Sequence, residues 1–275
     1  MAKGLGIIGN FKGKVGNIVG YNLKDSNNKQ TQGLRAYQPV VRNPKTAAQA
    51  EQRAKMAPIN ATYRALKGII DRGQEGVAYG NKSRLRFLSE AMKQFDGPWF
   101  EKGEAVTLPI KTNITRGSLT PIEVLENNDD GISVALSMGN VEQVATVAAL
   151  SSALLENNSF LKEGDQLTFV HGSKNGCSVL SIVLDSTDTT AVTSFDSQEG
   201  YLYVIFGSYI DTSTEFGCVI LSREGDNGQH LRSTTALTLS ANAAADTHYT
   251  STAKEAAIES YMAANGNTDW PEEQL

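Results

Sequence analysis

The chain begins Met1-Ala-Lys-Gly-Leu-Gly-Ile-Ile-Gly-Asn-Phe-Lys-Gly-Lys-Val-Gly-Asn-Ile-Val-Gly-Tyr21, and the role of these glycines decides the fold class. Gly4, Gly6 and Gly9 spell G-x-G-x-x-G, the pattern of dinucleotide-binding loops. That pattern needs a strand before the glycines, a helix after them and an acidic residue about 20 positions later. Three residues precede Gly4, and further glycines stand where the helix would begin. We therefore expect a glycine-rich β-ribbon and no bound dinucleotide.

The ribbon is expected to have a first strand over 17–23, a turn over 24–29 and a return strand over 30–41. The turn contains Asp, Ser and Asn, which favour tight reversals. Glycine weakens a strand but permits another backbone to approach closely. An isolated ribbon of this size gains little stability by itself. We therefore expect the ribbon to lie on another subunit.

A helical segment is predicted after Pro44, because the residue before a proline disfavours helix. Thr46 and Gln49 fit a capping box at the helix start. Pro58 is expected to kink or divide this helix. A second helix is predicted over 84–95. The first helical segment carries a narrow face of small residues suited to tight packing and a second, bulkier stripe, respectively Ala50, Ala54, Ala57, Ala61, Ala65 and Ile59, Tyr63, Leu66, Ile70. On the second helix, Leu85, Leu88, Met92 and Phe95 are expected to point inward together.

From Glu104 onward the pattern changes to β. Turn-forming residues separate apolar runs, with a helix inserted over 141–155 and a final helix over 252–264. The fold class predicted is α+β, with a basic ribbon-and-helix domain over 1–103 and an acidic, mostly antiparallel β domain over 104–275. The predicted strands are 105–108, 131–138, 166–171, 178–184, 201–209, 217–223 and 233–239.

Charge divides the chain in a similar way. Residues 1–111 contain 19 Lys and Arg against 8 Asp and Glu, a balance of +11, whereas residues 112–275 contain 6 against 22, a balance of −16. A basic region can face nucleic acid or an acidic protein partner. The simplest partner is the acidic half of another copy. Charge that is merely solvated on both halves is the alternative interpretation.

No pattern of catalytic chemistry stands out. His171, His230 and His248 show no metal-ligand spacing, and Cys177 and Cys218 form no C-x-x-C pair. No nucleophile elbow or phosphate-binding loop is present. We expect no catalytic residue, cofactor or metal, and two reduced thiols. No apolar run is long enough to span a membrane, and no secretion leader is expected.

Several segments together resemble an uncharacterised family found in Bacteroidota and in crAss-like bacteriophages. The resemblance rests on Gly9 to Tyr21, on Leu34-Arg35, and on Asn43 to Arg53, which opens a helix with N-P-x-T-x-x-Q-x-x-x-R. It covers residues 9–95 well and the C-terminal β region more loosely. It implies that the chain is the product of a phage structural gene. The tails of these phages resemble stacked rings around a DNA channel. No residue role can be carried over from this family.

The resulting hypothesis is that the chain is a structural subunit of a virion, a homo-oligomeric ring or barrel component of the tail. Its partners would be other tail or connector proteins, with non-specific contact to DNA, after synthesis in the host cytoplasm. The alternatives are a carbohydrate- or host-binding module using Trp99, Phe100 or Tyr249, a DNA-associated protein using residues 1–111, and an unrecognised enzyme. The candidate assembly contacts are Phe11, Gly13, Val15, Gly16, Tyr21, Arg35, Arg53 and Trp270.

Overall fold

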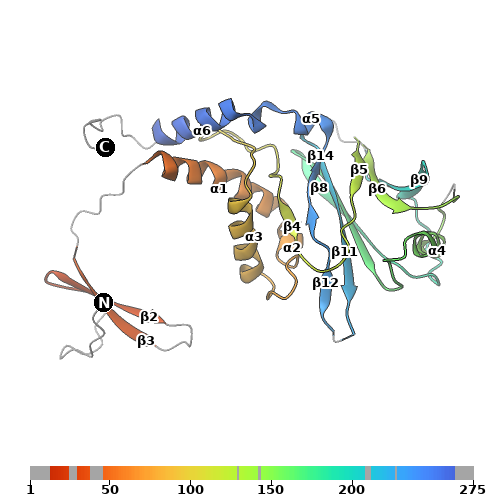
Figure 1. Ribbon diagram of the computed structural model, residues 1–275, viewed down its shortest axis with the longest axis horizontal. Helices are drawn as coiled ribbons and strands as arrows, with labels where there is room; N and C mark the ends of the chain where they lie inside the picture. The colour runs from red at the N-terminus through yellow and green to blue at the C-terminus, as the bar shows by residue number, and fades with distance from the viewer. Residues whose placement is uncertain are drawn as a thin grey trace. The chain divides into compact units, whose positions relative to one another are not determined.

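The computed structural model of the chain describes residues 13–24, 30–37, 46–128, 130–141, 144–207, 212–226 and 228–263. The chain separates into two compact units, residues 1–44 and residues 45–275. The α+β class predicted from the sequence is confirmed: an N-terminal antiparallel sheet precedes helices, further antiparallel sheets and a C-terminal helix (Figure 1).

The first unit contains a three-stranded antiparallel sheet in the order β1-β2-β3. Its strands confirm the ribbon within the described residues, and the predicted turn falls on residues 25–29, outside them. Gly16 and Asn17 form a two-residue turn between Val15 and Ile18, which pair directly. Gly16 has φ 57°, as the first central residue of such a hairpin turn requires. The strands are β1 (Gly13–Val15), β2 (Ile18–Lys24) and β3 (Gln30–Ala36).

The second unit opens with helices. Thr46 caps the first of them, accepting a hydrogen bond from the Gln49 backbone N–H, but the Gln49 side-chain oxygen has no partner among the described residues, so half of the predicted capping box forms. The expected division at Pro58 is wrong: the helix continues through this buried proline and ends at Ala65. The predicted alanine face is buried at its N-terminal end, with Ala54 against Ala257 of the C-terminal helix, and exposed at Ala65. These helices are α1 (Ala47–Ala65), α2 (Lys67–Ile70) and α3 (Asn81–Lys93).

The inward face of α3 follows the prediction in part. Leu88, Met92 and Phe95 pack against the core as expected, whereas Leu85 is exposed. Phe87 and Ala91 are fully buried beside them. Ser83 is buried as well, and its hydroxyl donates a hydrogen bond to the Ile70 carbonyl, which ties the first turn of α3 to the end of α2.

The central sheet of the second unit has the strand order β12-β11-β7-β8. Strand β11 reads Phe-Gly-Cys-Val-Ile-Leu-Ser from residue 216, and all seven side chains are buried. A strand covered on both faces carries such a continuous apolar run. The strands are β12 (His230–Arg232), β11 (Phe216–Glu224), β7 (Gln166–Ser173) and β8 (Gly176–Val183), and β14 (Thr238–Leu239) also pairs with β11.

A second antiparallel sheet lies on one side of the central sheet, with the order β5-β6-β10-β9. Its strands are β5 (Val124–Asn127), β6 (Gly131–Ser137), β10 (Tyr201–Ile205) and β9 (Phe195–Gln198), and the inserted helix is α4 (Val147–Asn157). A two-stranded ladder joins β4 (Asn113–Thr115) to β13 (Thr235–Ala236). The segment 105–108, expected to be a strand, is a loop.

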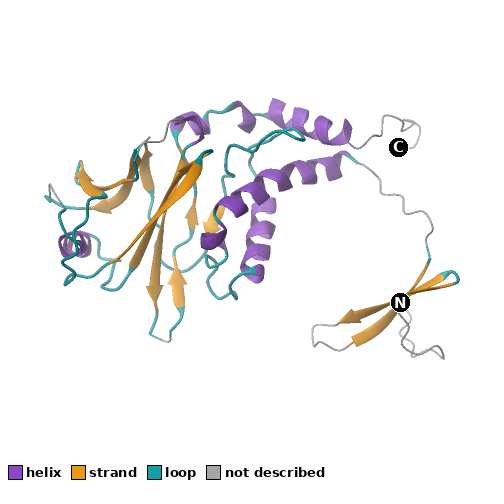
Figure 2. Ribbon diagram, turned by 180° about the vertical axis from the view of Figure 1, so that it is seen from behind, coloured by secondary structure: helices purple, strands orange, loops and turns teal. Residues whose placement is uncertain are grey.

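Two cores lie on opposite faces of the central sheet. Phe169 and Val219 pack with the second sheet and α4, whereas Val170 and Ile220 pack with Ile59 and other side chains of α1 to α3. Figure 2 shows the main helices gathered on one side of these strands. The helices and the β region therefore share a core, which places the predicted boundary at 103/104 inside one unit. The division between compact units is at 44/45 instead.

The C-terminal part of the described chain returns to α1. The short helix α5 (Ala241–Ala244) and two 3-10 turns, η1 (Thr212–Thr214) and η2 (Thr247–Tyr249), lead to α6 (Ser251–Ala263), which packs along α1. Trp99 is buried between these helices. The ammonium groups of Lys55 and Lys254 lie 5.8 and 5.4 Å from the centre of its ring. The predicted final helix is confirmed, displaced by one residue.

Candidate assembly surfaces

The N-terminal sheet exposes an apolar face. Directly paired residues of an antiparallel sheet lie on the same face, so Val15, Ile18 and Ala36 form one row and Gly13, Gly20 and Leu34 the next. The exposed fractions are 59% for Val15, 44% for Ile18 and 54% for Leu34. Two glycines leave Leu34 beside bare backbone, where another backbone can approach. This face has the character of a contact surface.

The opposite face of the N-terminal sheet carries aromatic and cationic side chains. The Tyr21 ring covers Gly33, at which an added Cβ would lie 2.6 Å from the ring. The Lys14 ammonium lies 3.4 Å from the centre of the Tyr37 ring, a cation–π contact. Arg35, paired with Val19, is exposed. The two faces therefore differ in chemistry, one apolar and one cationic.

The sheet lacks a core of its own among its described residues. None of the hydrophobic clusters formed by described residues includes a residue before Lys45. The unit 1–44 contains 7 Lys and Arg against 1 Asp, a balance of +6, whereas residues 45–275 contain 18 against 29, a balance of −11. A basic sheet with an exposed apolar face is thus joined to an acidic body.

The candidate contacts predicted from the sequence fall into three groups. Gly13, Val15, Gly16, Tyr21 and Arg35 lie together in the N-terminal sheet. Arg53 lies on α1 in the second unit, beside a shallow hollow lined by Met56, Arg64 and Val106. Phe11 and Trp270 lie outside the described residues. The sequence pattern identified the sheet but did not show which of its two faces is apolar, because that depends on strand register.

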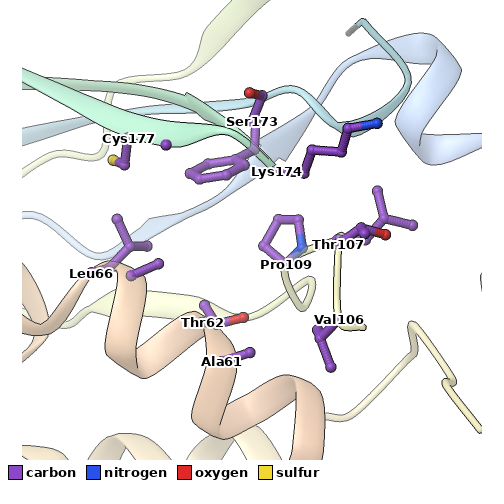
Figure 3. A pocket seen from close by; sticks show the side chains of 13 residues that line it. Ala61, Thr62, Leu66, Val106, Thr107, Pro109, Ser173, Lys174 and Cys177 are labelled. Atoms are coloured by element: carbon purple, nitrogen blue, oxygen red, sulfur yellow. The ribbon is translucent and has the colours of Figure 1, made fainter. Parts of the chain in front are cut away.

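A pocket of about 300 Å³ lies between α1 and the β7–β8 hairpin (Figure 3). Ala61, Thr62 and Leu66 form one wall, and Ser173 and Cys177 form the other. Burial raises the pKa of the Cys177 thiol to about 11, so the sulfur is protonated near neutral pH. A protonated thiol is a poor nucleophile. Both cysteines are free thiols, as expected, and Cys218 is fully buried in β11.

The buried titratable groups serve as structural ties. Arg223 donates to both carboxylate oxygens of Asp165, at 2.6 and 2.7 Å, and this pairing raises the pKa of the guanidinium. Glu75 accepts hydrogen bonds from the backbone N–H groups of Ser118 and Arg232, holding two distant segments together. Burial lowers the pKa of His171, which favours a neutral ring inside the sheet.

The aromatic residues considered for glycan binding are buried or engaged in the fold. Trp99 is 8% exposed and Phe100 is 1% exposed. The Tyr249 hydroxyl donates a hydrogen bond to the Pro109 carbonyl and fixes a loop. Carbohydrate sites use exposed aromatic faces, so these three residues do not form one. Three lysines on the helices are exposed: Lys67, Lys82 and Lys93. The loose contact with DNA phosphate therefore stays a prediction.

Comparison with known protein families, curated proteins and solved structures returns no match to this chain. Within the described ranges, no three His, Cys, Asp or Glu side chains gather closely enough to hold a metal ion. None of the helices in that part of the chain combines the length and hydropathy needed to cross a bilayer.

Proposed function

We propose that the chain is a non-enzymatic structural subunit of a phage virion, a ring or barrel component of the tail. It associates with copies of itself and with neighbouring tail proteins. The observation that carries this proposal is the exposed apolar face formed by Val15, Ile18 and Leu34 on the N-terminal sheet. A three-stranded sheet needs a packed face to be stable, and a second protein surface supplies one.

Charge supports association between copies. The +6 unit of one copy and the −11 body of another attract each other, which favours a head-to-tail contact. Head-to-tail contacts generate rings when the rotation between copies closes. The resemblance of residues 9–95 to a family that occurs in crAss-like phages supports the virion as the setting. The buried, protonated thiols and structurally engaged carboxylates favour a structural role over catalysis.

The test places charge on the apolar face of the N-terminal sheet. The double variant Ile18→Lys/Leu34→Lys should weaken self-association by about tenfold or more, since central interface residues contribute most of the binding free energy. Sedimentation equilibrium of the full chain measures the dissociation constant. The thermal unfolding midpoint of residues 45–275 should not change, because their cores do not contain these side chains.

The matched control is Leu85→Lys/Leu125→Lys, which introduces the same charge at two exposed apolar residues of the second unit. The proposal expects this control to associate like the wild type. Equal weakening by both double variants would mean that net charge alone governs association. Unchanged association of Ile18→Lys/Leu34→Lys would contradict a role for the sheet.

A further inference from the structure

Strand β8 is an edge of the central sheet in the part of the chain that the structure describes. Within the described residues it pairs with β7 along its whole length, without a register shift, and with no strand on its other side. It reads Gly-Cys-Ser-Val-Leu-Ser-Ile-Val from residue 176, with no charged residue and no proline. Val179 and Val183 point outward and are 53% and 50% exposed. Nothing in its sequence discourages a further strand from pairing.

Sheet edges in native proteins are normally blunted by short length, charge, proline or bulges. The opposite edge of the same sheet follows this rule, since β12 has three residues and carries His230 and Arg232. The edge strand of the second sheet, β9, carries Asp196. An eight-residue apolar edge with regular register is instead a template for strand addition, in which main-chain hydrogen bonds provide the affinity. Strand β8 therefore differs from its neighbours in being open to pairing.

A groove runs beside the C-terminal half of β8. It has a volume of about 480 Å³, and its walls are residues 180–183 and the segment that leads into β9. Its lining mixes apolar side chains, such as Leu180 and Phe195, with polar ones, and it includes Asp185 and Asp188. No Lys or Arg stands among the described residues that line it. Such a groove suits a cationic extended segment.

One segment of this chain has the matching chemistry. Strand β3 is the edge of the N-terminal sheet, because within the described residues it pairs with β2 alone. It has seven residues against eight in β8, it carries Arg35, and it belongs to the +6 unit. Leu34 offers an exposed apolar side chain to the apolar residues of the groove, and Arg35 offers a cation to Asp185 and Asp188.

We propose that β3 of one copy pairs edge-to-edge with β8 of a second copy, joining the N-terminal sheet of the first to the central sheet of the second. This inference rests on the proposed self-association and specifies where it occurs. Because donor and acceptor edges belong to different parts of the chain, each copy can accept one neighbour and donate to another. The pairing therefore propagates head to tail.

The direct test is photo-crosslinking from residue 34 in the full-length chain. A photoreactive phenylalanine analogue replaces Leu34, and the protein is mixed with ¹⁵N-labelled wild type before irradiation. Mass spectrometry then identifies both the crosslinked segment and the copy to which it belongs. The expected products join residue 34 to residues 176–195 of the labelled copy. Products that map to another segment, to the same copy, or to added DNA would overturn the inference.

A second test places charge on the edge itself. Val179→Lys/Val183→Lys should weaken self-association by about tenfold or more, while Leu125→Lys/Ile205→Lys, on exposed apolar residues of the second sheet, should not. Both wild-type valines are exposed, so folding should persist in the variant. If this variant associates normally but Ile18→Lys/Leu34→Lys does not, the inference fails and the proposed function stands. A wild-type chain that never associates contradicts both.

Discussion

At the scale of single residues, Asp165 and Arg223 form a buried electrostatic tie. Asp165 is fully buried, and its carboxylate also accepts a hydrogen bond from the Lys162 backbone N–H. The guanidinium donates further to the Phe160 carbonyl. This pair fixes the end of β7 and the loop before it against β11. Because both partners are fully engaged, loss of one leaves the other without compensation.

We predict that Asp165→Asn lowers the free energy of unfolding by about 3 kcal/mol, the cost of breaking a buried pair. Urea denaturation measures this change. The comparison is Glu51→Gln, which removes the partly exposed carboxylate paired with Lys55 and Lys254. That change should cost less than about 1 kcal/mol. Equal costs for the two variants would contradict the structural importance assigned to the buried pair.

His248 provides a pH-dependent tie at the same scale. Its Nδ1 lies 2.5 Å from Asp246 and its Nε2 lies 3.0 Å from Glu104. Its ring stacks on Phe100. Burial lowers the pKa of His248, but the hydrogen bonds to Glu104 and Asp246 outweigh this effect and raise it overall. A raised pKa in the folded state means that protonation stabilises the fold.

The stabilisation by His248 should be fully present below the pKa of the unfolded chain, about 6.5, and lost as pH rises through the raised value. We therefore predict that His248→Gln costs more unfolding free energy at about pH 5.5 than at about pH 8.5. A double-mutant cycle with Glu104→Gln isolates the coupling between the two residues. A coupling energy that is the same at both pH values would contradict this account.

At the scale of elements, helix α3 shows a difference between the local sequence pattern and the tertiary packing. Phe87 is 1% exposed and belongs to the core that α1, α2 and the central sheet share, whereas Leu85 is 56% exposed. We predict that Phe87→Ala lowers the free energy of unfolding by about 3–5 kcal/mol and that Leu85→Ala changes it by less than about 1 kcal/mol. Chemical denaturation of both variants checks this. A larger loss for Leu85→Ala would restore the face expected from leucine spacing.

The elements that could be predicted are those with strong local signals. Thr46 marked the start of α1, and turn residues separated apolar runs that became β6, β7, β8 and β11. On α3 the spacing correctly predicted that Leu88, Met92 and Phe95 face the core but misplaced Leu85, because Ser83 and Phe87 occupy the buried positions in the first two turns. The segment 105–108 lacked a pairing partner and became a loop. The short strands β4, β5, β9 and β12 were not predicted, since each depends on distant neighbours for its hydrogen bonds.

The sequence predicted the candidate site to a similar degree as it predicted the elements. Glycines and turn residues predicted the N-terminal ribbon, and the basic balance of residues 1–111 predicted nucleic acid or an acidic protein as the partner. Which side chains share a face depends on the pairing of Val15 with Ile18 and of Gly20 with Leu34, and this register cannot be read from composition. The open edge of β8 follows from strand order in space, for which the sequence offers no local signal.

At the scale of the whole molecule, the chain consists of a basic sheet with an exposed apolar face and a larger acidic body with its own cores. The body needs no partner to bury Phe87, Phe169 or Ile220. The sheet, in contrast, gains a packed face through association. This division of roles favours assembly in which the sheet supplies the contact and the body supplies the scaffold. Because opposite charges contribute, association should weaken as salt rises.

The central claim is self-association of the full-length chain, and its native mass tests this most directly. Light scattering at about 0.05 M and about 0.5 M NaCl measures the mass under weak and strong screening. The account predicts a defined multimer at low salt, with a smaller average mass at high salt. A monomer of 29.6 kDa under both conditions would contradict it.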